Sequence, residues 1–152
     1  MPRPDALHHQ LLRIVRWNTQ IGHPKGRTGR LIDRRWNAMS IRSIRTMENC
    51  SDLAHRFGVW MESHHPDVLW ARDIRPQHFI SWLQERYDEG CSLHTLATYV
   101  RRWKKIVRRM AWQGWCREAA LLEGLGQLPL QGAQSWPRGG AAAGIRAMRC
   151  GP

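Results

Sequence analysis

The 152-residue sequence predicts an all-α protein built on a small four-helix domain, followed by a disordered C-terminal tail. Two observations lead to this prediction. Apolar residues recur at spacings of three and four in four separate segments, as they do along one side of an amphipathic helix. Residues that begin and end helices bracket the same segments, with serine, aspartate or proline at the start and glycine at the end.

The first predicted helix begins at Asp5, whose carboxylate can cap it, and runs to about Gln20 before Gly22. A basic, glycine-rich segment follows, which is either a linker or an arm that tracks DNA phosphates. Its cations are Lys25, Arg27, Arg30, Arg34 and Arg35. We therefore expect residues 1–42 to be an N-terminal helix plus a basic arm.

The second predicted helix opens at Ser43 and runs to about His64, because the Ser43 hydroxyl can accept the backbone N–H three residues later. Gly58 weakens this helix by about 1 kcal/mol relative to alanine unless another element packs closely against it. Pro76 suits the first position of a third helix, which Gly90 ends. The buried side of this third helix is predicted to hold Phe79, Ile80, Trp82, Leu83 and Tyr87.

The fourth predicted helix, from Ser92 to Gly114, has two chemically opposite sides. At about 100° per residue, seven apolar residues fall within an arc of roughly 120°. They are Leu96, Tyr99, Val100, Trp103, Ile106, Val107 and Met110. The opposite arc holds only cations among its charged residues, namely Arg101, Arg102, Lys104, Lys105, Arg108 and Arg109.

The distribution of charge indicates a polyanionic partner. The chain has a formal net charge of +12, and residues 93–115 hold six Lys or Arg residues and no acidic residue. Solvated helix surfaces usually mix both signs, because like charges at i,i+4 spacing repel. A solvated surface and a membrane surface are the alternatives, but here other amphipathic helices are available to cover the apolar side. Nucleic acid is therefore the favoured partner.

Other residues give no signal for catalytic or metal chemistry. The four cysteines form no Cys-x-x-Cys pair and follow no secretory signal, so we expect reduced thiols in a cytoplasmic protein. The histidines lack zinc-site spacing, which predicts no metal and no cofactor. No apolar run reaches the length of a membrane span.

From Gly124 onward, glycine, proline and alanine dominate without periodicity, so residues 116–152 are expected to be a disordered or truncated linker tail.

Three motifs resemble the N-terminal core-binding domain of tyrosine recombinases, the phage integrase family. The first is Ser43-x-x-Thr46 followed by Leu53, Phe57 and Trp60. The second is the segment 73–83, DIRPQHFISWL, and the third is the segment 90–103, GCSLHTLATYVRRW. The motifs occur in the order that the family has, over about residues 40–115.

The resemblance implies a SAM-like helical unit that forms half of a clamp around double-stranded DNA, with residues 43–115 as the DNA-binding domain. It implies two helices against the major groove, corresponding here to those that open at Ser43 and Ser92, and other recombinase protomers as partners on DNA. Glu48, Asp52 and Glu62 make the later part of the Ser43 helix poorly suited to phosphate. Together with the basic arc, the resemblance predicts DNA contacts at Arg42, Arg45, Thr46, His94, Thr95, Thr98, Arg101, Arg102, Lys105, Arg108 and Arg109.

The catalytic half of such a recombinase is not recognisable in this sequence. The family cleaves DNA with a tyrosine nucleophile, an arginine pair and a His-x-x-Arg element, and the last of these does not occur here. Tyr87 and Tyr99 lie on apolar helix sides and are expected in the core. We therefore predict DNA binding without enzymatic activity and without a small-molecule substrate. Two alternatives stay open: an independent helical DNA-binding regulator, and an adaptor whose basic face meets an acidic protein.

Overall fold

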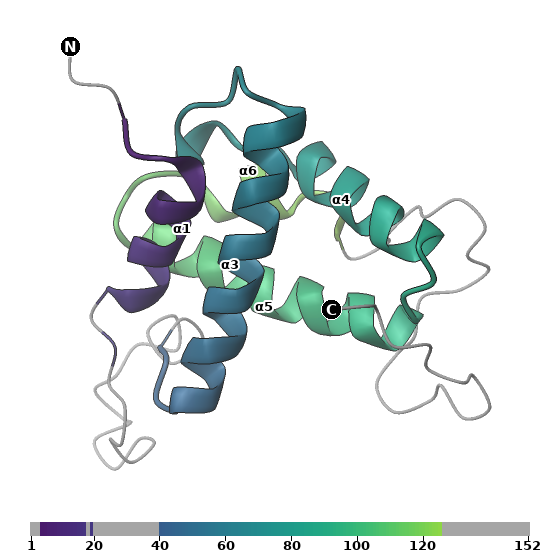
Figure 1. The fold of residues 1–152 in the computed structure, drawn as a ribbon. Coiled ribbons are helices and arrows are strands. Elements are labelled where there is room, and N and C mark those ends of the chain that lie inside the picture. The colour runs from purple at the N-terminus through teal and green to yellow at the C-terminus, as the bar shows by residue number, and fades with distance from the viewer. Residues whose placement is uncertain (1–3, 18, 20–39, 126–152) are drawn as a thin grey trace.

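A computed structural model describes residues 4–17, 19 and 40–125 of the chain. Within these residues all the regular secondary structure is helical and there is no strand, so the predicted all-α class is confirmed. Figure 1 shows the arrangement of the elements. These are α1 (Leu7–Arg16), α3 (Ile44–His64), the 3-10 turn η1 (Ala71–Asp73), α4 (Pro76–Asp88), α5 (Leu93–Trp112) and α6 (Glu118–Leu122).

The predicted start and stop signals of the three longer helices are confirmed. Ser43 and Ser92 are the N-caps of α3 and α5, and their hydroxyls accept the backbone N–H of Thr46 at 3.0 Å and of Thr95 at 3.1 Å. Pro76 is the first residue of α4. After α4, Gly90 adopts a φ of 102°, a left-handed conformation that favours glycine.

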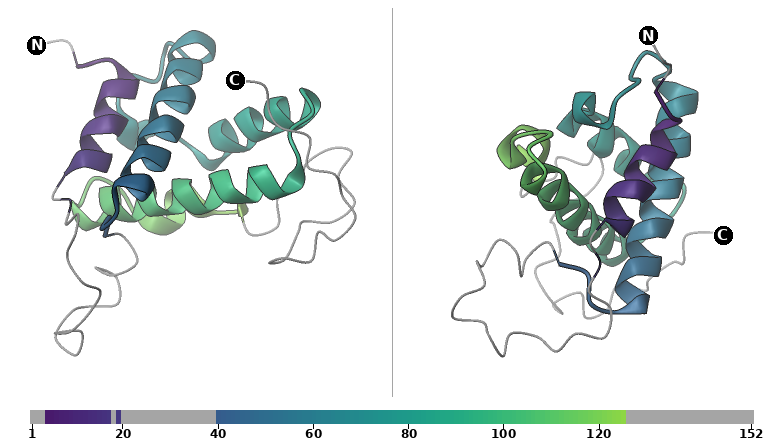
Figure 2. Two further views of the ribbon diagram at one scale, coloured as in Figure 1. Left: turned by 60° about the horizontal axis from the view of Figure 1, so that its bottom comes forward. Right: turned by 90° about the vertical axis from the view of Figure 1, so that its left-hand side faces the viewer.

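The helices form two layers. α1 and α3 lie side by side and run in opposite directions, and α5 crosses beneath them (Figures 1 and 2). At Gly58 the backbone of α1 lies close to α3: a Cβ atom at this position would lie 2.5 Å from the Cα atom of His8. The close packing of α1 therefore explains why α3 has a glycine at position 58, in agreement with the prediction that another element packs closely there.

Aromatic side chains from three helices join in the core. The Phe57 ring of α3 lies 5.2 Å from Phe79 of α4 and 5.1 Å from Trp103 of α5, measured between ring centroids. Phe79 and Trp103 stack with an interplanar angle of 12°. Trp82 and Tyr99 extend the cluster with a centroid distance of 5.2 Å. This cluster fixes the crossing of α3 and α5, and with it the orientation of the basic side of α5.

The first helix differs from its prediction at both ends. It begins after Ala6, because the Asp5 carboxylate pairs with Arg13 instead of capping the backbone. It ends at Arg16, before the expected end near Gln20. α1 also packs into the same core as α3, so it belongs to the helical domain that we expected to begin at residue 43.

The expected tail also differs in its first ten residues. Residues 116–125 include the short helix α6, which packs against α5. Leu121 and Leu125 are buried in the core, although no apolar periodicity predicted them. The rest of the expected tail, residues 126–152, lies outside the described residues.

The cysteines meet their expectation in part. Cys50 and Cys116 are free thiols, whereas Cys91 is disulfide-bonded. The expectation of four reduced thiols is therefore wrong for Cys91.

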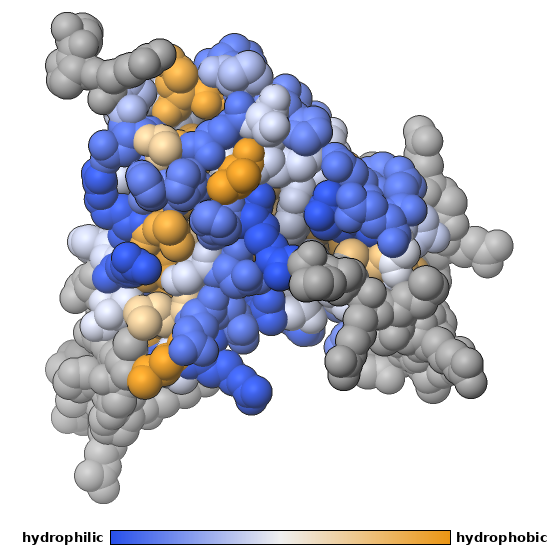
Figure 3. All heavy atoms as spheres, in the orientation of Figure 1, coloured by the Kyte–Doolittle hydropathy of each residue, from blue (hydrophilic) through white to orange (hydrophobic). Residues whose placement is uncertain are grey.

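The face of the molecule seen in Figure 3 is mostly hydrophilic, and apolar residues show on it only in small, separate patches. Single large apolar residues such as Ile44, Val59 and Leu69 are exposed on the domain. Scattered apolar residues of this kind are normal on a protein surface. Within the described part of the chain, no helix is both long enough and apolar enough to cross a bilayer.

Candidate nucleic-acid interface

The apolar side of α5 is buried as predicted, and this turns its opposite side outward. All seven predicted core residues, from Leu96 to Met110, are buried. On the opposite side Arg101 is exposed, and Arg102, Lys104 and Lys105 are partly exposed. We call these four residues, Arg101, Arg102, Lys104 and Lys105, the basic stripe of α5.

The basic stripe lacks acidic partners in the part of the chain that the structure describes. The ion pairs found there involve other cations, such as Arg56 with Asp52 and Arg86 with Glu85 and Glu89. Arg102 instead lies over the Tyr99 ring, 5.9 Å from its centroid. Like charges this close together on one helix raise the local potential and attract an anion.

Lys105 connects the stripe to the start of α3. Its Nζ atom donates a hydrogen bond to the carbonyl oxygen of Ser40 at 2.9 Å. Burial lowers the pKa of Lys105, and the neighbouring charges of Arg109, Arg108 and Arg42 lower it further, while Cys50 has the opposite effect. Arg42 and Lys105 therefore belong to one basic region, as the prediction of contacts from both helices requires.

Polar groups continue the stripe toward the start of α5. The Thr98 hydroxyl donates to the carbonyl oxygen of His94 at 3.1 Å and accepts from a terminal nitrogen of Arg101 at 3.0 Å. His94 is exposed, and Thr98 is partly exposed. His94, Thr98 and Arg101 follow each other at spacings of four and three, so they lie in line on one side of the helix.

The two predicted helix starts have the same local geometry but lie apart. In each, the serine and threonine hydroxyls lie within hydrogen-bond distance, at 2.8 Å for Ser43 and Thr46 and 3.0 Å for Ser92 and Thr95. The start of α3 lies near the C-terminal half of α5, beside Lys105. Thr95 lies ten residues, or about 15 Å, away from Lys105, toward the N-terminal end of α5. An anionic partner that touches both starts must span that distance.

Two of the predicted contact residues have other roles. Arg109 has no exposed surface, because its Nε atom donates to the carbonyl oxygen of Ile14 at 2.9 Å and its guanidinium lies over the Trp17 ring. The prediction of a DNA contact at Arg109 is therefore wrong. Burial lowers its pKa to about 10, which leaves it charged at neutral pH. Arg108 pairs with Glu118 of α6 at 3.1 Å, so part of its charge is already compensated.

The remaining candidates divide into surface residues and residues that the structure does not describe. Arg45 is exposed, and Thr46 and Arg42 are partly exposed, at the start of α3. The predicted arm cations at positions 25, 27, 30, 34 and 35 lie outside the described residues. Lys104 was not among the predicted contacts, although its place in the basic arc was visible in the helical period.

The two tyrosines and the Cys50 thiol pack in or against the core. Tyr99 is buried and Tyr87 packs partly buried against the core. Burial raises the pKa of the Cys50 thiol, against the effect of nearby Lys105, Arg102 and Arg109, which keeps the thiol neutral at pH 7. No group of three or more His, Cys, Asp or Glu side chains suited to a metal ion occurs within residues 4–17, 19 and 40–125.

Comparisons of the chain with protein-family models, with curated protein sequences and with solved structures give no match. The resemblance to tyrosine recombinases therefore rests on the three sequence motifs alone.

Proposed function

We propose that this chain is a DNA-binding module that contacts duplex DNA through the basic stripe of α5 and the start of α3. One observation carries the proposal: Arg101, Arg102, Lys104 and Lys105 lie on the outer side of one well-packed helix and have no ion pair within the described residues. Phosphate groups would supply the missing negative charge, and the release of their counterions would drive binding.

The dimensions of α5 suit this role. From His94 to Arg108 the outer side of the helix extends for about 21 Å, and a helix fits the roughly 12 Å width of the major groove. The start of α3 adds Arg45 and a helix N-terminus, both of which favour phosphate. Arg45 and Thr46 would then contact the DNA backbone, while His94, Thr95, Thr98 and Arg101 would approach the groove.

The three motifs favour the core-binding domain of a tyrosine recombinase as the source of this module. In such a protein it would form half of a clamp on DNA next to other protomers. We propose that the chain binds without cutting, since no His-x-x-Arg element occurs in the sequence and its two tyrosines pack against the core.

Fluorescence anisotropy with a labelled duplex of mixed sequence tests the proposal. We expect an apparent Kd that weakens steeply as salt rises, with log K falling linearly against log salt. Polyglutamate of the same charge should compete poorly, because it lacks the groove and the fixed phosphate spacing. Equal competition by polyglutamate would favour an adaptor for acidic proteins, and no binding at low salt would reject the proposal.

A denaturing gel tests the absence of cleavage. Duplex incubated with the protein should stay intact, and no protein–DNA adduct should survive SDS. An adduct that disappears on Tyr87→Phe or Tyr99→Phe substitution would show a nucleophile that the packing of both rings argues against.

A further inference from the structure

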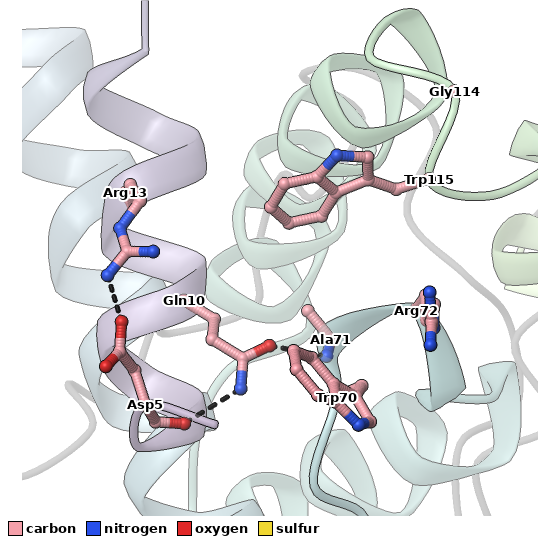
Figure 4. A pocket seen from close by; sticks show the side chains of 8 residues that line it. All are labelled: Asp5, Gln10, Arg13, Trp70, Ala71, Arg72, Gly114 and Trp115. Atoms are coloured by element: carbon pink, nitrogen blue, oxygen red, sulfur yellow. Dashed lines mark hydrogen bonds and ion pairs between the residues drawn. The ribbon is translucent and has the colours of Figure 1, made fainter. Parts of the chain in front are cut away.

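A cleft of about 350 Å³ lies on another part of the surface, between the start of α1, the η1 turn and the glycine turn after α5 (Figure 4). Two tryptophans, Trp70 and Trp115, face each other across it in this view, and Arg13 and Arg72 lie at its two sides. Its volume is near the lower end of the ~300–1,000 Å³ that small-molecule sites occupy.

Both tryptophans of the cleft are partly open to solvent. Trp70 is 43% exposed and Trp115 is 40% exposed. Indoles bury large apolar areas when they pack, so two that stay open beside one cavity leave apolar surface for a ligand. Elsewhere in the domain, Trp82 and Trp103 are almost completely buried, and Trp112 is 41% exposed but does not line the cleft. Trp70 and Trp115 therefore differ from the other tryptophans in being open beside the same cavity.

A buried amide holds the floor of the cleft in place. The Gln10 side chain donates to the carbonyl oxygens of Asp5 at 2.8 Å and Leu69 at 2.7 Å, and it accepts the backbone N–H of Ala71 at 3.0 Å. Leu69 and Ala71 flank Trp70 in the sequence, so Gln10 fixes the backbone that carries Trp70 against α1. The site is thereby organised before any ligand arrives.

The charged groups leave one net positive charge at the rim. Arg13 pairs with Asp5, whereas the Arg72 guanidinium lies over the Trp70 ring, 5.4 Å from its centroid. Arg72 thus stacks on an aromatic face and still has donors directed to solvent, because a guanidinium carries five N–H groups. One uncompensated guanidinium matches one phosphodiester or phosphate group.

We infer that the cleft binds an unstacked nucleotide, with its base against the indoles of Trp70 and Trp115 and its phosphate at Arg72. Planar bases stack on aromatic side chains and arginine binds phosphate, so the two parts of a nucleotide match the two kinds of group in the cleft. An inorganic anion would leave the indoles unused, and an apolar ligand would leave Arg72 unused. This inference goes beyond binding of duplex DNA by α5 and does not depend on it.

Isothermal titration with deoxyadenosine monophosphate, deoxyadenosine and deoxyribose 5-phosphate tests the inference on the full chain. We expect the monophosphate to bind more tightly than either fragment. Trp115→Leu and Trp70→Leu should each weaken its binding roughly tenfold or more, which corresponds to the loss of one base–aromatic stack. Arg72→Gln should weaken binding of the monophosphate and leave that of deoxyadenosine unchanged.

Trp112→Leu is the matched control, because Trp112 is 41% exposed but does not line the cleft. It should leave nucleotide binding unchanged. Equal binding of the monophosphate and deoxyribose 5-phosphate, no binding at all, or an equal loss in Trp112→Leu would each overturn the inference. Tighter binding of a pentanucleotide of deoxyadenosine identifies a DNA strand as the source of the nucleotide, and equal binding identifies a free mononucleotide.

The same variants separate this inference from the proposed function. Trp115→Leu should keep the affinity for duplex DNA that the unmodified chain has. If the chain binds the nucleotide but not duplex DNA, the proposed function of the basic stripe is rejected and the nucleotide site in the cleft stands. If it binds duplex DNA but not the nucleotide, only the nucleotide site is rejected.

Discussion

The Nε atom of Arg109 lies 2.9 Å from the carbonyl oxygen of Ile14 and donates a hydrogen bond to it. Ile14 is in the last turn of α1, where carbonyl groups lack partners within the helix. A cation from α5 therefore caps the C-terminal end of α1, where the helix dipole favours positive charge. This contact joins the first helix of the chain to the last long one.

Substitution of Arg109 by methionine should destabilise the domain. The change keeps much of the apolar stem but removes the charged donor from the Ile14 carbonyl, which retains only the backbone N–H of Trp17 at 3.3 Å. Loss of a buried hydrogen bond to a charged group costs about 1–3 kcal/mol. Urea unfolding followed by circular dichroism measures the difference. Arg101→Met on the exposed stripe is the control and should stay within about 0.5 kcal/mol of the unmodified protein. Similar effects of the two changes would show that the contact with Ile14 contributes little.

Replacing Gly58 by alanine should also destabilise the domain, against the usual helix preference. Alanine in a helix is favoured over glycine by about 1 kcal/mol. Here, however, the new methyl group would lie 2.5 Å from the Cα atom of His8, and overpacking of this kind costs about 1–3 kcal/mol. Ser63→Ala on the exposed side of α3 is the control. An increase in thermal midpoint for Gly58→Ala would show that α1 can move away from α3 easily.

Local signals made most of the fold predictable. Ser43, Ser92 and Pro76 each sit at a helix start whose chemistry is complete within four residues, so the sequence contains the whole cause. Arg109 shows the opposite case. Helical periodicity assigns it to the basic arc between Arg102 and Lys105, but its burial depends on where α1 ends, some 95 residues earlier in the chain.

Contacts between distant segments were not predictable in the same way. Leu121 lies in α6, which is too short to display a period and which packs against both α5 and α4, and Leu125 is buried just after α6 ends. The cleft likewise joins Arg13, Trp70 and Trp115 from three segments, and no spacing in the sequence relates them. The long amphipathic helices could therefore be predicted from one sequence, whereas α6 and the surfaces that form where helices meet could not.

Leu121 offers a direct test of the contribution of α6. As a buried leucine, its substitution by alanine should lower the free energy of unfolding by about 2–5 kcal/mol. Unfolding in urea gives the value. Leu69→Ala provides the control, because Leu69 is 53% exposed and its truncation opens no cavity. No loss of stability in Leu121→Ala would restore the original expectation that the tail begins at residue 116.

His78 should make the stability of the domain depend on pH. Burial lowers its pKa below the ordinary 6.5, aided by His65 and Arg75 and opposed by Asp67. Its Nδ1 atom also accepts the backbone N–H of Arg75 at 2.9 Å, which requires an unprotonated Nδ1. The unfolded chain therefore binds the proton more readily than the folded chain, and stability is lost as pH falls below about 6.5.

His78→Gln is the matched variant for this effect, because an amide oxygen can accept the same hydrogen bond without titrating. Unfolding free energies between pH 7.5 and 5 should fall less steeply in the variant than in the unmodified protein. An NMR titration of His78 should give a pKa below 6.5. A value above 6.5 would mean that protonation strengthens the start of α4, contrary to the observed hydrogen bond.

The salt dependence of DNA binding tests the basic stripe of α5. Each cation that no longer meets a phosphate should reduce the slope of log K against log salt by about 0.9. Replacing Arg101, Arg102, Lys104 and Lys105 together by glutamine should therefore flatten the slope by roughly 2–4 units. Arg56→Gln is the control, because it removes one charge from the outer side of α3, where Arg56 pairs with Asp52, and it should change the slope less than Arg101→Gln does.

Two further positions of α5 separate charge from other contributions to DNA binding. Arg109 is fully buried against the end of α1, so its substitution should lower the free energy of unfolding. The slope of log K for DNA binding against log salt should stay the same for the protein that remains folded. Thr95→Ala should weaken binding with little change in slope, since a hydroxyl at the helix start contributes a hydrogen bond and no charge. Titrations at several salt concentrations measure both effects. An unchanged slope in the four-site variant would show that the basic stripe is only solvated, and DNA binding would then have to use another surface.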